Sequence, residues 1–381
     1  MNSKTSKNLR SIVLFLITML CFGAMGYCIG MLIKLDGSHA KHIILLRLGY
    51  SLLWAFVSLF AAVIIHESGH LVMGLRSGYD FVSFRIGSLV WIRQNGKLTC
   101  RKLSIQGTLG QCLLMPKQTD RPEAIKCKAY FIGGGLFNLI TAAVTLPLLA
   151  VDMSFYLKMP IFMLAIFSLY LGLINLIPLS GNIANDGYNV ATLNDHPADK
   201  VFIYNQLRVN GLMTQGKTPL EIDHKLFETP DGLSDMYVVP AELMRASVLI
   251  IKHEYEQAKE IISESLKTEN SMKIYINEAK CELIYCECML GSPREQIDKL
   301  LDRETKAYIK AASRTLISKP RVMYAYYKLC AKDEAAAKAE YDKAMKLQGS
   351  YAIPGELKCE LELIGEVTRR SMSDDSASND E

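Results

Sequence analysis

The chain has 381 residues, 50% of them hydrophobic, and a formal net charge of +4 at pH 7. This excess of positive charge is small, and Lys and Arg in the inner loops of a membrane protein would account for it. No nucleic acid is therefore expected as a partner. The apolar residues are concentrated before about position 180 and most of the charge follows it. We therefore expect two regions that face different solvents.

The first apolar stretch, residues 11–33, contains no charged side chain. A helix of that length crosses the roughly 30 Å hydrocarbon core of a bilayer. The alternative is a cleaved signal peptide, because Lys4, Lys7 and Arg10 resemble its basic start. The apolar stretch is longer than the core of a usual signal peptide, and no small-residue cleavage site follows it. We therefore interpret residues 1–40 as an N-terminal transmembrane helix.

Three more apolar runs, residues 48–65, 131–151 and 159–179, are long enough to span a bilayer. The sequence thus predicts a mainly α-helical, multi-pass membrane protein with about four transmembrane helices. Lys and Arg are frequent before the first span, between the second and third, and after the fourth, although the connection between the first two spans is also basic. This bias predicts a protein of the cell membrane with both termini in the cytoplasm.

The second span ends in the sequence His66-Glu67-Ser68-Gly69-His70. A spacing of four residues places both imidazoles on one helical face, where they can bind one zinc ion, and Glu67 can take a proton from the attacking water. The alternative, two interfacial histidines without a metal, is weaker, because ionisable groups at the edge of a span are costly and tend to be functional. We therefore predict one catalytic Zn²⁺ bound by His66 and His70, with Glu67 as the base.

The connection between the second and third spans, residues 76–130, is predicted to be a cytoplasmic β-hairpin region. Residues 81–86, 89–93 and 97–105 are typical of short strands, with Asn95-Gly96 as a hairpin turn. Residues 109–111 are interpreted as an extension of the same loop. A sheet edge at this place can pair with an unwound substrate, although a surface hairpin without substrate contact fits equally well.

A catalytic zinc usually has a third protein ligand. Pro178 should end the helix of the last span, and the loop after it can carry Asp186 back to the metal, with Gly187 allowing a tight turn. An ordinary Asn-Asp-Gly turn explains these residues equally well. Asp195 and His196 are substitutes for the third ligand.

Three motifs in order resemble the site-2 protease family of intramembrane zinc metalloproteases. They are His-Glu-x-Gly-His at residues 66–70, Gly-Gly-Gly-Leu-Phe-Asn at 133–138, and Asn-x-x-Pro at 175–178 followed by Asp-Gly at 186–187. The resemblance covers about residues 45–195. The chain departs from the family in the last motif, where the connection is commonly shorter and richer in proline.

The resemblance implies a residue-by-residue assignment. His66, His70 and Asp186 would be the zinc ligands, Glu67 the general base, and Asn138 a group near the substrate that donates to the oxyanion. It also implies an intramembrane endopeptidase core over residues 41–200. The substrate would be a membrane-anchored protein, cut in its transmembrane segment near the cytoplasmic face.

The charged region after residue 200 is predicted to contain three helix pairs: 241–251 with 254–266, 280–290 with 294–301, and 321–330 with 334–347. Ala258, Ile297 and Ala337 align at steps of 39 and 40 residues. We interpret residues 201–370 as a cytoplasmic, tetratricopeptide-like helical domain that can bind a protein partner, although a plain helical bundle explains the pattern equally well. Residues 371–381 have few apolar groups and should form a disordered acidic tail.

An intramembrane protease is therefore the main functional hypothesis. A membrane-anchored scaffold, whose repeats recruit a partner, is the alternative from another class. Intact Glu67 argues for the enzyme, because a structural zinc site needs no base. A metal-dependent hydrolase of a non-peptide substrate is a further alternative that the sequence leaves open.

Overall fold

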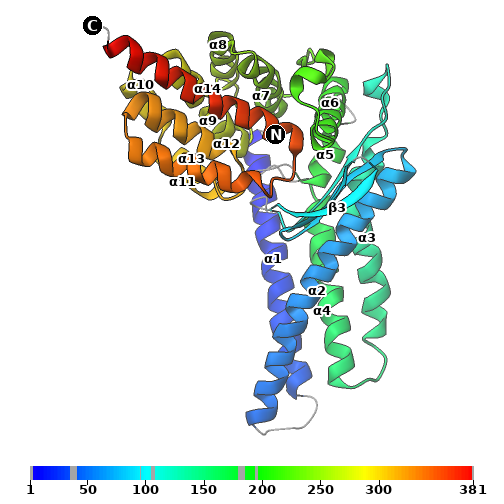
Figure 1. Ribbon diagram of the computed structural model, residues 1–381. Coiled ribbons are helices and arrows are strands. Elements are labelled where there is room, and N and C mark those ends of the chain that lie inside the picture. The colour runs from blue at the N-terminus through cyan, green and yellow to red at the C-terminus, as the bar shows by residue number, and fades with distance from the viewer. Residues whose placement is uncertain are drawn as a thin grey trace. The chain divides into compact units, whose positions relative to one another are not determined.

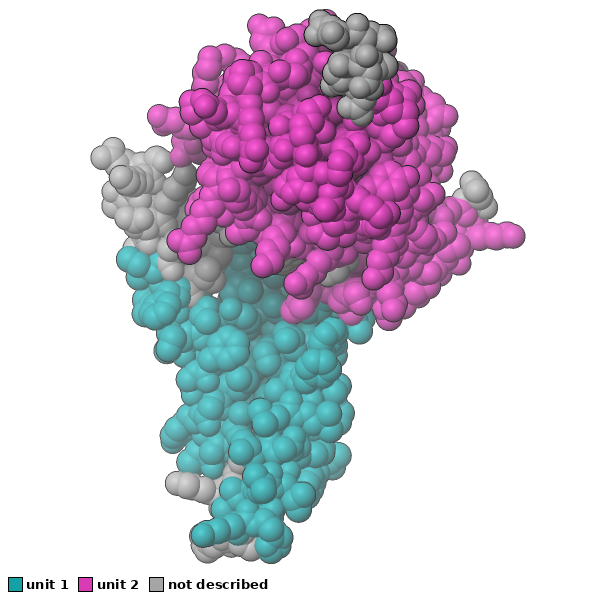
Figure 2. All heavy atoms as spheres, turned by 60° about the vertical axis from the view of Figure 1, so that its left-hand side comes forward, with its two compact units in different colours: residues 1–79, 110–112, 126–194 teal, residues 80–109, 113–125, 195–381 magenta. Residues whose placement is uncertain are grey.

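The computed structural model describes residues 3–34, 41–94, 96–103, 108–178, 185–193 and 196–379. The chain divides into two compact units, which Figure 2 shows in different colours. Unit 1 comprises residues 1–79, 110–112 and 126–194, and unit 2 comprises residues 80–109, 113–125 and 195–381.

Unit 1 is built from the helices α1 (Ser3–Lys34), α2 (Lys41–Arg76), α3 (Cys127–Leu148), α4 (Phe155–Leu176) and α5 (Asp186–Thr192). The helices α2, α3 and α4 pack against one another, and α1 packs along α4 (Figure 1). In the described part of the chain, three helices are long and apolar enough to cross a membrane: Lys41–Arg76, Pro122–Leu148 and Phe155–Leu176. The described apolar part of α1, Phe15–Met31, is shorter, so the fourth span stays a prediction.

Helix α2 exposes apolar side chains and buries polar ones, the opposite of a helix on the surface of a water-soluble protein. Its large apolar side chains Leu45, Leu46 and Phe56 are exposed, whereas the polar residues Ser51 and Ser58 are buried. Such a helix satisfies its polar groups within the bundle and presents hydrocarbon to its surroundings. This distribution supports the assignment of α2 to a membrane.

The predicted strands are confirmed in a sheet of β1 (Asp80–Ile86), β2 (Leu89–Gln94), β3 (Lys97–Lys102) and β4 (Gly110–Met115), in the order β3-β2-β1-β4. The pairs β1/β2 and β2/β3 are antiparallel. Gly96 has φ +75°, as a tight hairpin turn requires, while Asn95 and residues 104–107 lie outside the described residues. Strand β4 corrects the interpretation of residues 109–111 as loop, because only its pairing in the sheet makes this short segment a strand.

Unit 2 continues with helices whose bounds are α6 (Pro197–Thr214), η2 (Pro219–Glu221), η3 (His224–Phe227), α7 (Asp235–Ile251), α8 (Tyr255–Ser265), α9 (Lys273–Leu290), α10 (Arg294–Leu300), α11 (Arg303–Ala312), α12 (Ser318–Ala325), η4 (Tyr326–Ala331), α13 (Glu334–Gln348) and α14 (Pro354–Asn379). The 3₁₀ segment η1 (Pro122–Ala124) precedes α3.

The predicted helix pairs correspond to α7 with α8, α9 with α10, and α12 and η4 with α13. Ala258, Ile297 and Ala337, which the spacing aligned, are all buried in the core of this unit. Helix α11 separates the second pair from the third, so a regular two-helix period is not established and the tetratricopeptide-like repeat stays a prediction.

The acidic tail differs from the expectation of disorder. Helix α14 continues as far as Asn379, and the last two residues lie outside the described residues. Adding a residue to an existing helix costs far less than nucleating one, so a polar segment can extend a helix that is anchored by packing at its start.

Candidate metal centre

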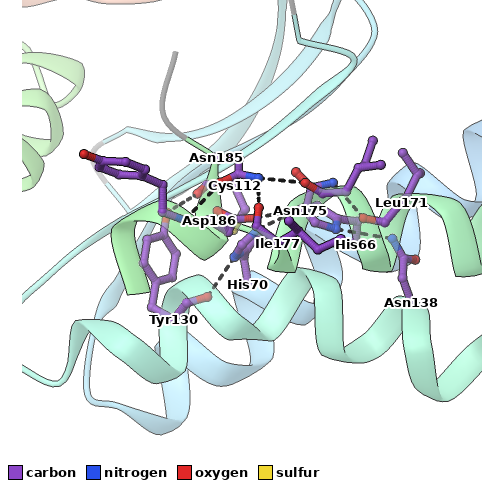
Figure 3. A network of polar contacts seen from close by, with 12 residues as sticks. His66, His70, Cys112, Tyr130, Asn138, Leu171, Asn175, Ile177, Asn185 and Asp186 are labelled. Atoms are coloured by element: carbon purple, nitrogen blue, oxygen red, sulfur yellow. Dashed lines mark hydrogen bonds and ion pairs between the residues drawn. The ribbon is translucent and has the colours of Figure 1, made fainter. Parts of the chain in front are cut away.

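Three side chains of unit 1 bring their donor atoms together. His66 and His70 lie one turn apart on α2, and Asp186 is the first residue of α5 (Figure 3). The Nε2 atoms of the two histidines are 3.1 Å apart. Asp186 Oδ2 lies 3.3 Å from Nε2 of His66 and 3.2 Å from Nε2 of His70.

This spacing fits the coordination of a zinc ion. Nitrogen and oxygen ligands at about 2.0 to 2.1 Å in a tetrahedral arrangement are separated from one another by about 3.3 Å. The separations of the three donors, 3.1 to 3.3 Å, match that value. Both histidines are buried, as a preformed metal site with restricted access for water requires. The residues present therefore fit one metal ion with an open position for water.

Asp186 reaches the histidines because the chain reverses after α4. The helix ends at Leu176, and Ile177 is extended (φ −72°, ψ 122°) in front of Pro178, as the residue before a proline must be. Asn185 then joins the two helices, since its amide donates to the carbonyls of Ile174 and Ile177, at 2.7 Å each. The predicted helix end at Pro178 is confirmed.

The start of α5 corrects the interpretation of Gly187. Asn185 caps α5 by accepting a hydrogen bond from the Tyr188 amide at 2.9 Å, so Asp186 and Gly187 lie in a helical turn. A glycine is needed at position 187 because the backbone there lies close to the end of α4, and not because of a tight turn. A Cβ at Gly187 would lie 2.2 Å from the carbonyl oxygen of Leu176.

His70 is oriented by the backbone of α3. Its Nδ1 lies 2.7 Å from the carbonyl oxygen of Tyr130, and a carbonyl can only accept. His70 therefore carries a proton on Nδ1, which leaves Nε2, the atom that faces Asp186, to bind a metal. A ring hydrogen bond of this kind is the usual support of a metal-binding histidine.

Asn138 supports His66 in the same way. Asn138 lies on α3, and its amide nitrogen is 3.3 Å from Nδ1 of His66 (Figure 3). As placed, the amide nitrogen faces the ring while the buried Oδ1 has no hydrogen-bond partner among the described residues. Rotating the amide by 180° lets Oδ1 accept from Nδ1–H and leaves Nε2 of His66 available for a metal. The side chain is completely buried.

The glycines of α3 allow this helix to reach the histidines. A Cβ at Gly133 would lie 2.4 Å from the carbonyl oxygen of Gly69, so the backbones of α2 and α3 are in direct contact here. A Cβ at Gly134 would lie 2.4 Å from Nε2 of His70 and 2.6 Å from Nε2 of His66. The glycine run thus supplies the space in which the two imidazoles stand.

Glu67 is buried beside the histidines, next to the start of β4. A Cβ at Gly110 would lie 2.5 Å from Glu67 Oε1, which places the strand backbone against the carboxylate. Cys112 follows on the same strand, and burial, with the charge of Glu67 as a smaller cause, raises the pKa of its thiol. Cys112 is thus kept neutral and unreactive.

The structure brings together His66, His70, Asp186 and Asn138, with Glu67 on the same helix turn. Of the substitutes for the third ligand, Asp195 lies outside the described residues, and His196 precedes α6 in unit 2. The carbonyl of Tyr130 and the contact of Gly110 were missed in the sequence, since a backbone group carries no residue-type signal. The side chain of Asn185 was missed as well, although Asn is a common helix cap.

Comparisons of the chain with models of known protein families, with curated proteins and with solved structures find no match. The resemblance of the three motifs to the site-2 protease family thus stays a prediction.

Proposed function

We propose that this protein is a zinc-dependent intramembrane endopeptidase. The observation that carries the proposal is the convergence of His66, His70 and Asp186 donor atoms to within 3.3 Å of one another, with Glu67 adjacent. The two histidines and the glutamate lie on one of the apolar helices that can cross a membrane. A His-Glu-x-x-His helix with a distant carboxylate is the ligand set of hydrolytic zinc enzymes.

His66, His70 and Asp186 would hold the metal. A zinc ion bound there would lower the pKa of a water molecule and polarise the scissile carbonyl. Glu67 accepts the proton that water loses on attacking the carbonyl carbon, and returns it to the nitrogen of the leaving amine as the peptide bond breaks. A structural metal site would have no use for this base.

Asn138 has a different role in this proposal from the oxyanion donor that the resemblance implies. Its contact is to the ring nitrogen of His66 that faces away from the metal-binding atom. We propose that Asn138 and the carbonyl of Tyr130 are positioning groups, which select the tautomers of His66 and His70.

The substrate is proposed to be the transmembrane segment of a membrane-anchored protein. A helix in a bilayer satisfies its own backbone groups, so it must unwind before hydrolysis. Strand β4 is an edge of the described sheet, and its residues 110–112 belong to the same unit as Glu67. Pairing of the unwound segment with β4 would hold a peptide bond in extended form beside the base.

The membrane arrangement belongs to the same proposal. We propose four spans, with residues 11–33 as the first, in the cell membrane with both termini in the cytoplasm. Cleavage would then occur near the cytoplasmic face, where water can reach the ends of α2 and α4. The helices of unit 2 would contribute a surface for a protein partner.

The test compares purified wild-type protein with Glu67→Gln and Asp186→Ala in two measurements: zinc content and cleavage of a reporter transmembrane peptide. Glu67→Gln should keep its zinc and lose at least about 10²-fold in cleavage rate, since it lacks only the base. Asp186→Ala should lose both zinc and cleavage. Full activity in both variants would overturn the proposal and favour a membrane-anchored scaffold.

A further inference from the structure

Unit 2 contains a pocket of about 360 Å³ that the candidate metal centre does not use. Residues of five helices line it, from α6, α7, α9, α12 and α14. A volume of this size falls in the range of pockets that bind small molecules. The pocket is thus large enough for one or two amino-acid residues.

Four carboxylates lie in its wall. Glu278, Glu282, Glu356 and Glu360 line the pocket together with Arg321, and Lys319 lies two residues before Arg321 in α12. Lys319 is completely buried and pairs with Glu278. The four carboxylates outnumber the two cations, and an unpaired charge in a buried place is unfavourable unless a counter-ion meets it.

Arg321 uses only part of its hydrogen-bonding capacity. Its Nη2 donates to both oxygens of Glu282 at 2.7 Å, and its Nε donates to Glu360 at 2.7 Å. The guanidinium also lies over the ring of Tyr285, 4.2 Å from its centre. The residue is 1% exposed, yet Nη1 has no hydrogen-bond partner among the described residues. A buried N–H without an acceptor costs about 1 to 3 kcal/mol, so this pocket-lining residue can still bind an acceptor.

Glu356 is the carboxylate that lacks a cation. It accepts a hydrogen bond from the Tyr351 hydroxyl at 2.7 Å and forms no ion pair with the described residues. Burial, together with the charge of Glu360, raises the pKa of Glu356 to about 7. A positively charged group placed in the pocket would remove this penalty.

The remaining wall is apolar. Helices α6 and α7 contribute Val209, Met213, Leu243 and Met244, and Phe227 adds an aromatic ring. Methionine side chains adapt to apolar groups of different shape. The pocket therefore combines a site for a cation, a site for an acceptor and a surface for an apolar side chain.

We infer that this pocket binds an α-ammonium group next to a carbonyl or carboxylate oxygen, with an apolar side chain: the N-terminal residue of a short apolar peptide, or the free amino acid. The ammonium would lie among the carboxylates at Glu356, the oxygen would accept from Arg321 Nη1, and the side chain would contact α6 and α7. This site is independent of the proposed proteolysis.

The test is isothermal titration of the full-length protein in detergent, carrying Glu67→Gln so that no probe is hydrolysed. The probes are leucyl-leucine, leucine and N-acetyl-leucyl-leucine. The first or the second should bind saturably, and acetylation should weaken binding at least about 10-fold, because it removes the charge. Stronger binding of leucyl-leucine identifies a peptide as the ligand, and stronger binding of leucine identifies the free amino acid.

Two variants locate the binding. Glu356→Gln keeps an acceptor for Tyr351 but removes the charge, and Ser247→Trp fills the pocket from α7. Both should weaken binding at least about 10-fold, while Glu362→Gln, an exposed residue of the same helix as Glu356, should bind like the parent protein. Equal binding of the acetylated probe, no saturable binding at about 10 mM, or binding that both pocket variants retain would overturn the inference.

Discussion

The two buried polar clusters of this protein are assembled in opposite ways. In unit 1, His66 and His70 come from one turn of one helix, and Asp186 follows the end of another. In unit 2, the charged residues come from three helices, α9, α12 and α14. The first cluster is visible in the sequence as a motif, whereas the second has no local pattern.

The clusters also differ in how their charge is compensated. The donors of the candidate metal centre are two imidazoles and one carboxylate, with no ammonium or guanidinium group among them, so they could hold a metal ion. At the pocket of unit 2, Arg321 pairs with Glu282 and Glu360, and the nearby Lys319 pairs with Glu278, so that Glu356 is left without an ion pair among the described residues. A compact divalent cation such as zinc suits the candidate metal centre. A single ammonium group suits the uncompensated negative charge in the pocket of unit 2.

The largest effect is expected from Gly134→Ala. The added methyl group would lie 2.4 Å from His70 Nε2 and would displace the atom that binds the metal. Zinc content of the purified protein, measured by elemental analysis, should fall to background, and cleavage should fall by at least about 10³-fold.

Gly49→Ala is the matched control. This glycine lies in α2, the helix of His66 and His70, but a Cβ there meets nothing within 4 Å, so zinc and activity should stay at the wild-type level. Normal zinc content in Gly134→Ala would mean that α3 does not contact the imidazoles as described.

Substitution of Asn138 separates a positioning role from an oxyanion role. Asn138→Asp keeps an acceptor for Nδ1–H of His66 and should retain zinc, while Asn138→Leu should weaken zinc affinity by about 10- to 100-fold. Competition with a zinc chelator measures both. If Asn138→Leu binds zinc normally and loses only cleavage, Asn138 acts on the substrate instead.

Gly110→Ala should separate metal binding from catalysis. A Cβ at this position would lie 2.5 Å from Glu67 Oε1, so the carboxylate must move while the zinc ligands stay in place. We expect wild-type zinc content with a cleavage rate about 10- to 100-fold lower, seen in kcat more than in KM. An unchanged kcat would show that Glu67 does not depend on β4.

The smallest effect concerns the stability of unit 2. The pKa of Glu356 is raised to about 7 in the folded protein by burial, with Tyr351, Glu360, Lys319 and Glu278 as its charged or polar neighbours. The folded state therefore holds a proton that the unfolded state releases at about pH 4.5. The contribution of Glu356 to stability is greatest below that pH and falls as the pH rises towards 7.

Glu356→Gln cannot ionise and should remove this part of the pH dependence, a difference of about 1 to 3 kcal/mol between pH 4.5 and 7. Thermal unfolding of the wild type and the variant across that range measures it. Parallel pH profiles would show that Glu356 is ionised in the folded protein.

Much of the architecture could be predicted from local sequence. The apolar runs at α2, α3 and α4, the hairpin strands and the three helix pairs of unit 2 lie near where period and composition placed them, because these signals act over a few residues. Helices α6, α11 and α14 were not predicted. The sequence left open whether Asp186 is the third metal ligand, since a turn of Asn, Asp and Gly has the same sequence whether or not a metal is near. Strand β4 was missed because a short edge segment becomes a strand only through its partner.

The sequence by itself determined which side chains stand together on α2: two imidazoles and a carboxylate at helical spacing, in a helix apolar enough for a membrane. Only the tertiary structure decided that Asp186 completes the donor set, that Asn138 and Tyr130 orient the histidines, and that carboxylates from three helices surround Arg321. The physical reason is the distance along the sequence over which each kind of interaction acts. Helical periodicity fixes neighbours within a turn, whereas contacts between distant helices depend on packing, on close approach at glycine, and on backbone groups that every residue shares.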